Sequence, residues 1–211
     1  MSDMHMQKQF IVGVSGASGA LYAENFIKNL AMHVPGKSAL IVSDAALRVY
    51  REEIHPSVRT ADDYRDALLE NLPSERKHHF EIYSSSDIGA PPASGSSSYE
   101  AMIILPCSMK TLSAVSHGHA SNLLERAADA CIKERKKLIL VPRETPYSSI
   151  HLQNMLNITH AGAVILPASP GFYHKPKSLE DLAVFLTSKI FHQLGIQYAQ
   201  SIIWEGDHET A

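Results

Sequence analysis

The sequence predicts a three-layer α/β fold, a Rossmann-like or flavodoxin-like parallel sheet with helices on both faces. Short apolar segments alternate along the chain with longer segments of helical periodicity, which is the pattern of such folds. The short segments are apolar at nearly every position, as strands buried on both faces are. Loops rich in glycine, serine and proline follow these segments, where the carboxyl ends of parallel strands bind ligands.

In the first half of the chain, each predicted strand is a short apolar run and each predicted helix has apolar residues at helical spacing. The run Phe10–Val14 is the clearest strand, because serine and glycine follow it directly. The elements predicted here are, in order, a strand at Phe10–Val14, a helix at Ala20–Met32, a strand at Ala39–Val42, a helix after Ser43, a helix at Asp62–Leu72 and a strand at Phe80–Tyr83.

The second half continues the alternation after Ser84–Ser98, a stretch of serine, glycine and proline that predicts a flexible active-site loop. The elements predicted after it are, in order, a strand at Ala101–Leu105, a helix at Asn122–Lys136, a strand at Leu138–Val141, a helix at Ile150–Thr159, a strand at Ala163–Leu166 and a helix at Leu179–Leu194. No internal repeat or linker divides the sequence. We therefore expect one domain over residues 1–211, with tails at 1–8 and 197–211.

The composition excludes several classes of protein. The 211 residues include 22 acidic residues against 19 Lys and Arg, a net charge of −3, so the chain lacks the basic footprint of a nucleic-acid binder. A hydrophobic content of 45% excludes a disordered chain. The charged fraction of 19% lies below the ~25% usual for soluble proteins, which suggests that other subunits cover part of the surface.

The cellular location follows from what the sequence lacks. Its apolar runs are far shorter than the ~20 residues of a membrane span, and the N-terminus has no apolar stretch typical of a secretory signal. Two cysteines, Cys107 and Cys131, cannot build a disulfide framework. We therefore expect a cytoplasmic protein.

Two loops offer hydrogen-bond donors for an anion. Gly13–Gly19 connects a strand to a helix N-terminus, where backbone N–H groups and the helix dipole favour phosphate; a plain tight turn is the alternative. It fits neither the P-loop nor the dinucleotide motif. In Pro106–Thr111, Ser108, Thr111 and the N–H groups suit a second anion or the carbonyls of a heterocycle, and Lys110 could add charge. We expect Cys107 to be a buried structural residue rather than a nucleophile.

A third loop, Val141–Pro146, contains Arg143, which suits phosphate, and Glu144, a candidate general acid or base; a surface ion pair is the alternative. On the long helix, Arg126 and Lys133 share one face and could clamp a phosphate. Acidic neighbours make a solvated face the simpler interpretation of that pair. These neighbours are Glu125, Asp129 and Glu134.

Two further features have weaker signals. The pair His117 and His119 supplies only two ligands, whereas a zinc site needs three or four, so we expect no metal. Trp204, the only tryptophan, stands in the C-terminal tail and either packs on the protein or caps a ligand pocket.

Taken together, these loops resemble the UbiX flavin prenyltransferases. The similarity extends from about Ile11 to Ile196, and the ordered set of motifs is highly specific although no single motif is. The segments that carry it are Gly13–Gly19, Pro91–Ser96, Leu105–Ser113, Glu125–Asp129, Lys133–Arg135, Val141–Pro146, His151–Met155, Gly162–Pro167 and Gly171–His174.

The resemblance implies a flavodoxin-like flavoprotein domain that forms a homododecamer. It implies transfer of a dimethylallyl group from dimethylallyl phosphate to N5 and C6 of reduced FMN, without a metal. The product, prenylated FMN, would serve a partner decarboxylase of the UbiD type, in ubiquinone synthesis or aromatic-acid metabolism.

The resemblance also implies roles for individual residues. The FMN contacts would be Gly16, Ala17, Ser18, Ser43, Ser108, Met109, Lys110, Thr111 and Arg143. The donor-phosphate contacts would be Arg126, Lys133, Arg143, Tyr173 and Lys189, where many relatives have arginine in place of Lys189. Ser18 and Glu53 would relay a proton from the flavin, Glu144 would shuttle protons, and Trp204 would cover the pocket.

Three alternatives remain. A cysteine decarboxylase of the phosphopantothenoylcysteine type would share the fold and FMN, but it would have a Pro-x-Met-Asn stretch where this chain has Pro142-Arg-Glu-Thr. Direct decarboxylation of an aromatic acid is the second alternative. A non-catalytic FMN-binding subunit is the third, and it would be expected to lose the cations that bind phosphate.

Overall fold

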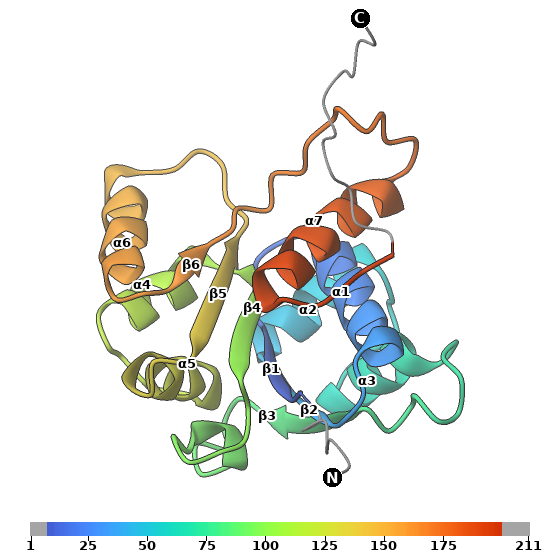
Figure 1. The fold of residues 1–211 in the computed structure, drawn as a ribbon, viewed down its shortest axis with the longest axis horizontal. Helices are drawn as coiled ribbons and strands as arrows, with labels where there is room; N and C mark the ends of the chain where they lie inside the picture. The colour runs from blue at the N-terminus through green and yellow to red at the C-terminus, as the bar shows by residue number, and fades with distance from the viewer. Residues whose placement is uncertain (1–7, 200–211) are drawn as a thin grey trace, which may run out of the picture.

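A computed structural model describes residues 8–199, and within this range the chain builds one parallel sheet (Figure 1). The strand order is β3-β2-β1-β4-β5-β6, and every neighbouring pair is parallel. The strands are β1 (Phe10–Val14), β2 (Ser38–Val42), β3 (Phe80–Ser84), β4 (Ala101–Cys107), β5 (Lys137–Pro142) and β6 (Val164–Ile165). The predicted fold class is confirmed.

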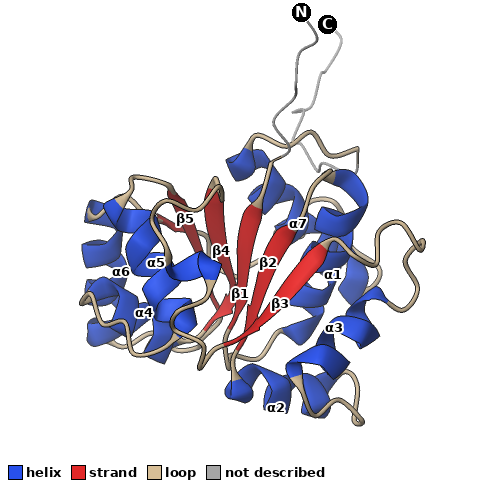
Figure 2. Cartoon of the chain, turned by 90° about the horizontal axis from the view of Figure 1, so that it is seen from below, coloured by secondary structure: helices blue, strands red, loops and turns tan. Residues whose placement is uncertain are grey.

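The helices form two layers, one on each face of the sheet (Figure 2). One layer contains α1 (Ala20–His33), α2 (Asp44–Glu53), α3 (Ala61–Leu69) and α7 (Leu179–Leu194). The other contains α4 (Met109–Ser116), α5 (Leu123–Lys133), α6 (Ser149–His160) and a short 3₁₀ turn, η1 (Pro91–Ala93).

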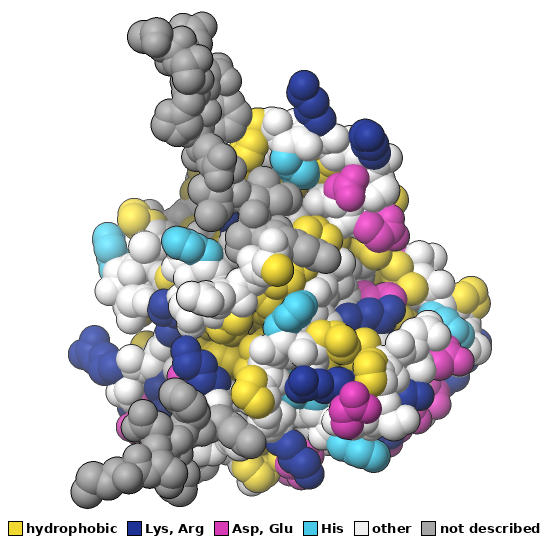
Figure 3. Space-filling view, turned by 45° about the vertical axis from the view of Figure 1, so that its right-hand side comes forward, with side chains coloured by type: hydrophobic (Ala, Val, Ile, Leu, Met, Phe, Trp, Pro, Cys, Tyr) yellow, Lys and Arg dark blue, Asp and Glu magenta, His cyan; other side chains and the backbone are white. Residues whose placement is uncertain are grey.

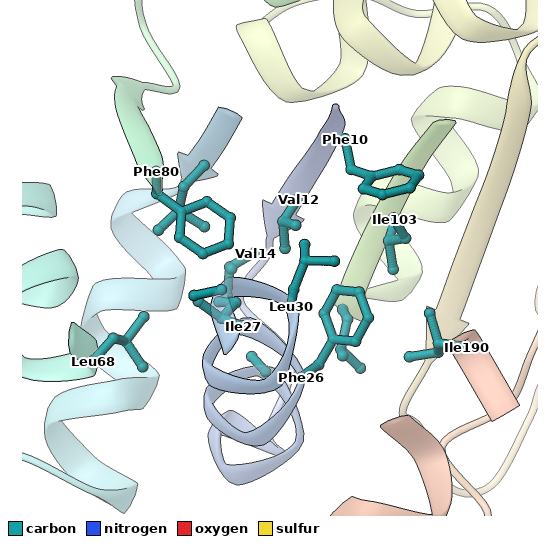
Figure 4. Close-up of a cluster of buried hydrophobic side chains, with 14 of the residues drawn as sticks. Phe10, Val12, Val14, Phe26, Ile27, Leu30, Leu68, Phe80, Ile103 and Ile190 are labelled. Atoms are coloured by element: carbon teal, nitrogen blue, oxygen red, sulfur yellow. The ribbon is translucent and has the colours of Figure 1, made fainter. Parts of the chain in front are cut away.

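The alternation of side chains along each strand divides the core in two. In β1, Phe10, Val12 and Val14 point toward α1, whereas Ile11 packs on the opposite side among the residues of α4 and α5. Figure 4 shows the first of these clusters, with Val12 and Val14 of β1 facing Leu30 and Ile27 of α1. Both faces of the central strands β1, β2 and β4 are therefore buried, which explains their almost continuously apolar sequences.

The strand order reverses between β1 and β4. The strands β2 and β3 are added on one side of β1, and β4, β5 and β6 are added on the other. Doubly wound sheets bind their ligands at this switch point, beyond the carboxyl ends of the strands. The loops after β1 and β4 are tied together there. The Ser15 hydroxyl donates to the Pro106 carbonyl at 2.8 Å and accepts from the Ser108 amide at 2.7 Å.

Two of the predicted loops are shorter than expected. Pro106 and Cys107 still belong to β4, and α4 begins at Met109, so only Ser108 connects the two elements. Ser108 can end the loop so abruptly because its side chain caps α4, accepting from the Thr111 amide at 3.2 Å. Pro142 likewise remains within β5.

Several predicted boundaries were also wrong, and local chemistry explains them. A capping box between Thr60 and Asp63 starts α3 one residue early, and the helix ends at Leu69 rather than Leu72. Asn122 caps α5 instead of lying within it, and the helix stops at Lys133, two residues before Arg135 with a φ of 57°. The last strand, β6, has only two residues, although four were expected.

The segment Ser84–Ser98 is a crossover that lies mostly away from the carboxyl edge. It leaves β3 at that edge and returns to the amino end of β4, passing over α5 through η1. Near its end the Lys136 ammonium donates to the carbonyls of Gly95, at 3.2 Å, and Ser97, at 2.7 Å. Within one chain, therefore, only its first residues lie beside the ligand edge, and the active-site role predicted for the whole segment stays a prediction.

A buried histidine at the amino end of β3 makes stability depend on pH. His79 is 4% exposed, and burial lowers its pKa from 6.5 to about 4. Between these values the unfolded chain binds a proton that the folded chain does not, so the free energy of unfolding falls as the pH falls. We expect this residue alone to remove about 2–3 kcal/mol between pH 7 and pH 4.5, measured by urea denaturation.

The adjacent exposed residue His78 provides the matched control. The His79→Gln variant should lose a large part of the pH dependence in this window, whereas His78→Gln should retain all of it. Equal slopes for the wild type and His79→Gln would show that the buried imidazole does not cause the effect.

Candidate functional site

The loop after β1 packs too closely against α2 for a side chain at Gly16. A Cβ atom there would lie 2.4 Å from the Cβ of Ala45. Gly19 has a φ of 113°, and a Cβ atom there would lie 2.9 Å from the Tyr22 ring. Ser43 holds the start of α2 beside this loop, with its amide donating to the Val14 carbonyl at 3.1 Å. The predicted Gly16, Ala17, Ser18 and Ser43 therefore lie together at the carboxyl edge.

The N-terminus of α1 already holds an anion from within the chain. The Glu53 carboxylate, at the end of α2, accepts from the amides of Gly19 at 3.0 Å and Ala20 at 2.8 Å. This carboxylate meets the positive end of the helix dipole, as a bound phosphate would. Those two amides are therefore not available to a ligand, contrary to the anion site expected at this helix start.

The starts of α2 and α4 have donors that no group occupies. The amides of Asp44 and Ala45 in α2, and of Met109 and Lys110 in α4, have no hydrogen-bond acceptor among residues 8–199. The hydroxyl of Ser43 lies beside the amides of α2, and the hydroxyl of Ser108 lies beside those of α4. At these two helix starts the backbone can bind phosphate oxygens or the carbonyl oxygens of a heterocycle. The site therefore suits FMN, which carries both kinds of acceptor.

Arg143 joins this group from the end of β5. Its Nε donates to the Ser18 carbonyl at 3.0 Å, and its charge lies close enough to Tyr22 to oppose the rise that burial causes in the pKa of that phenol. The two terminal guanidinium nitrogens have no acceptor among the described residues. Arg143 is thus anchored through one nitrogen and keeps two donors for an anion.

Glu144 follows Arg143 and is exposed. Its Oε1 accepts from the Thr145 amide at 3.0 Å, which fixes the orientation of the carboxylate. Its Oε2 makes no hydrogen bond within the described range. A carboxylate held by one oxygen can exchange a proton through the other.

Tyr173 and Lys189 meet around one aromatic ring, and we call Tyr173, His174, Phe185 and Lys189 the Phe185 cluster. The Lys189 ammonium lies 5.2 Å from the centroid of the Phe185 ring, and the Tyr173 ring packs edge-on against Phe185 at 5.8 Å. His174 stacks on Phe185 at 5.3 Å. Phe185 and His174 were not predicted as site residues, because aromatic residues in or near a helix usually belong to the core.

Lys133 does not reach the other predicted residues within one chain. It ends α5 at the amino edge of the sheet, and β5 then runs six residues, ~20 Å, to Arg143 at the carboxyl edge. Arg126 is exposed in the first part of α5. Trp204 lies outside the described residues.

Glu125, interpreted from sequence as part of a solvated face, is instead buried, with its side chain 1% exposed. Its carboxylate binds the Lys110 ammonium and accepts from the Ser121 amide at 2.9 Å. The expected solvated face is therefore wrong at this position. The helical pattern could have indicated it, because Glu125 stands between the buried residues Leu124 and Ala128.

The remaining candidates are Cys107 and the pair His117 and His119. Cys107 is buried, as expected, and burial raises the pKa of its thiol above its ordinary value, which disfavours the reactive thiolate form. His117 and His119 stack at 6.3 Å, and no group of three metal-binding side chains forms within residues 8–199. No helix of this part of the chain is long and apolar enough to cross a membrane.

A separate cavity of about 700 Å³ lies between α3 and β3, away from the switch point. Charges of both signs line it, including Lys37, Asp62 and Glu81. None of the predicted site residues contributes to it, and we assign it no role in the chemistry.

Comparison with known proteins shows which family the chain resembles. A family model described as Flavoprotein matches residues 1–189. The flavin prenyltransferase UbiX of Methanothermobacter thermautotrophicus is 43% identical over 204 residues, which are 96% of this chain and 98% of that protein.

Two solved structures share the fold closely. A dodecameric FMN-dependent UbiX-like decarboxylase from Escherichia coli O157:H7 has a TM-score of 0.82 and 33% identity, over 94% of this chain and all of that one. AnUbiX (PadA1), solved in complex with FMN and dimethylallyl pyrophosphate, has a TM-score of 0.81 and 35% identity, over 95% of this chain and 98% of that one.

Proposed function

Because the chain belongs to the flavoprotein family and, within it, to the UbiX flavin prenyltransferases, we propose that it transfers a dimethylallyl group from dimethylallyl phosphate to reduced FMN. One observation carries the proposal. Available amides at two helix starts and the two available donors of Arg143 meet at one edge of the sheet. This edge can therefore bind two phosphorylated molecules side by side.

FMN would lie against the starts of α2 and α4. The amides of Met109 and Lys110, with the hydroxyls of Ser43 and Ser108, would donate to its phosphate and ring carbonyls. Gly16 lets the loop after β1 pack against Ala45 beside these helix starts, and the resemblance assigns FMN contacts to Gly16 and Ala17. When bound, reduced FMN supplies the nucleophilic N5 and C6 positions that receive the prenyl group.

The donor phosphate would be bound by cations from the carboxyl edge. The C–O bond of the donor breaks, phosphate leaves with its electron pair, and Arg143 stabilises the negative charge where it develops. Tyr173 and Lys189 of the Phe185 cluster would hold the same phosphate, and Arg126 is a further candidate. Lysine at position 189 supplies charge without the two-pronged geometry of arginine.

Protons must move as the new bonds form. N5 and C6 each lose one, and the prenyl skeleton gains one when the new ring closes. Glu144 has an available carboxylate oxygen for this transfer, and Ser18 and Glu53 would relay the N5 proton away from the ring. Trp204 lies outside the described residues, and its role as the cover of the pocket rests on the resemblance alone.

We also propose that the chain forms a homo-oligomer. The dodecamer of the E. coli relative suggests how many copies it contains. Large apolar side chains on α6 are exposed, among them Ile150 at 69% and Leu152 at 54%. On the face drawn in Figure 3, hydrophobic side chains also reach the surface between charged ones. If Lys133 binds the donor phosphate as the resemblance implies, a second copy must supply it. We place the enzyme in the cytoplasm, where its two buried thiols stay reduced, and expect a UbiD-type decarboxylase to use its product.

Mass spectrometry of the bound flavin tests the proposal. The protein is incubated without oxygen with FMN, dithionite and dimethylallyl phosphate, and we expect a flavin heavier by one five-carbon prenyl unit. Unmodified FMN with both the monophosphate and the diphosphate donor would contradict it. A second sample, with an aromatic acid in place of the prenyl donor, separates the alternative, decarboxylation of an aromatic acid on unmodified FMN, because the flavin mass then stays constant while carbon dioxide is released.

A further inference from the structure

Lys110 and Glu125 form an ion pair between the starts of two helices. The Lys110 side chain is 71% exposed on the first turn of α4, whereas the Glu125 side chain is 1% exposed on the first turn of α5. One carboxylate oxygen binds the ammonium, and the other accepts from the Ser121 amide at 2.9 Å. The pair therefore connects α4 to α5 and to the loop between them.

The buried carboxylate needs these partners to stay charged. Burial acts to raise the pKa of Glu125, but the Lys110 ammonium, the Ser121 amide and the Asn122 side chain outweigh it, and the pKa lies below its usual value. A buried carboxylate that loses its cation is strongly destabilised. The positive charge of Lys110 is thus already neutralised before any ligand binds.

The backbone amide of Lys110, unlike its side chain, is available to a ligand. The Lys110 amide is one of the two at the start of α4 that have no acceptor in the described part of the chain. We propose that Glu125 is a positioning residue of the flavin site, which holds the Lys110 side chain toward α5 so that α4 presents backbone amides, and not a lysine charge, to FMN. This inference rests on the proposed function, because it assumes that FMN binds at α4.

The alternative is that Lys110 binds FMN through its own charge, and a double-mutant cycle separates the two. In Lys110→Met the carboxylate is buried without its cation, the α4 start is displaced, and we expect FMN to bind about tenfold more weakly or worse. In Lys110→Met/Glu125→Gln no uncompensated charge remains. We expect its FMN affinity to return to within about threefold of the wild type.

The single variant Glu125→Gln gives a second readout. It releases the lysine charge beside the phosphate site, so FMN affinity should depend more steeply on salt than in the wild type. The double variant should show the wild-type salt dependence. A purely structural pair would affect thermal stability without this change in salt dependence.

The measurement is a fluorescence titration of FMN into the full-length apoprotein at two salt concentrations, with the thermal midpoint of each variant recorded. Arg48→Met and Glu52→Gln are the controls, because that exposed pair on α2 has the same charges at 3.0 Å. Lys110→Gln replaces Lys110→Met if the methionine variant is insoluble. A double variant as weak as the lysine variant would overturn the proposal, and absence of FMN binding in the wild type would instead overturn the proposed function.

Discussion

Replacing Glu144 by glutamine should slow prenyl transfer by at least about a hundredfold while FMN binds as before. General acid–base groups contribute roughly 10²–10⁴ to rates, and this carboxylate lies at the carboxyl edge with one oxygen oriented by a hydrogen bond and the other available. Glutamine keeps the shape and can still accept from the Thr145 amide, but it cannot exchange a proton. Single-turnover formation of prenylated flavin, followed by mass spectrometry, gives the rate, and a fluorescence titration gives the FMN affinity.

Glu52→Gln is the matched control, since it removes an exposed carboxylate that, among the described residues, pairs only with Arg48 on the surface of α2. It should leave both the rate and the affinity within about twofold of the wild type. Equal losses of rate and FMN affinity in Glu144→Gln would assign this residue to flavin placement instead of proton transfer.

The fold could be predicted largely from local sequence patterns. The strands around Phe10–Val14 and Leu138–Val141 are apolar at almost every position, which is typical of strands that helices cover on both faces. Errors arose where one side chain decides a boundary, as with Thr60 at α3 and Asn122 at α5. Periodicity does not detect a cap, because the cap depends on a single hydrogen bond.

The site was predictable where it lies at strand ends and not where it depends on long-range contacts. Ser43, Ser108 and Arg143 follow strands, so the topology of a parallel sheet brings them together. The two hydrogen bonds between the Glu53 carboxylate and the start of α1 join residues that are 34 and 33 positions apart in the sequence. No local sequence pattern indicates such a contact. The pairing of Lys110 with Glu125 depends likewise on the packing of α4 against α5.

The structure also changes which helix start is available to phosphate. By sequence, the glycine-rich loop before α1 is the more obvious anion site, since it combines glycines and serines at a helix N-terminus. In the fold Glu53 occupies that position, and the available amides lie at α2 and α4 instead. Glycine in this loop therefore serves close packing, at Gly16 against Ala45, rather than the binding of an anion through α1.

Arg143 should be the residue whose loss most impairs use of the prenyl donor. Its Nε is held by the Ser18 carbonyl, so the guanidinium plane is fixed while two donors remain for the leaving phosphate. Removing one donor that stabilises transition-state charge costs roughly 10²–10³ in rate. We expect Arg143→Ala to lower kcat/KM for dimethylallyl phosphate by about a thousandfold.

The conservative variant Arg143→Lys makes the test specific, because a single ammonium cannot hold Ser18 and bind a phosphate in two-pronged geometry at once. We expect it to recover less than about a tenth of the lost kcat/KM, although the charge is unchanged. Arg48→Lys, on the exposed surface of α2, should have no effect. Full activity in Arg143→Lys would show that charge alone suffices and that the anchored orientation seen in the structure has no part in catalysis.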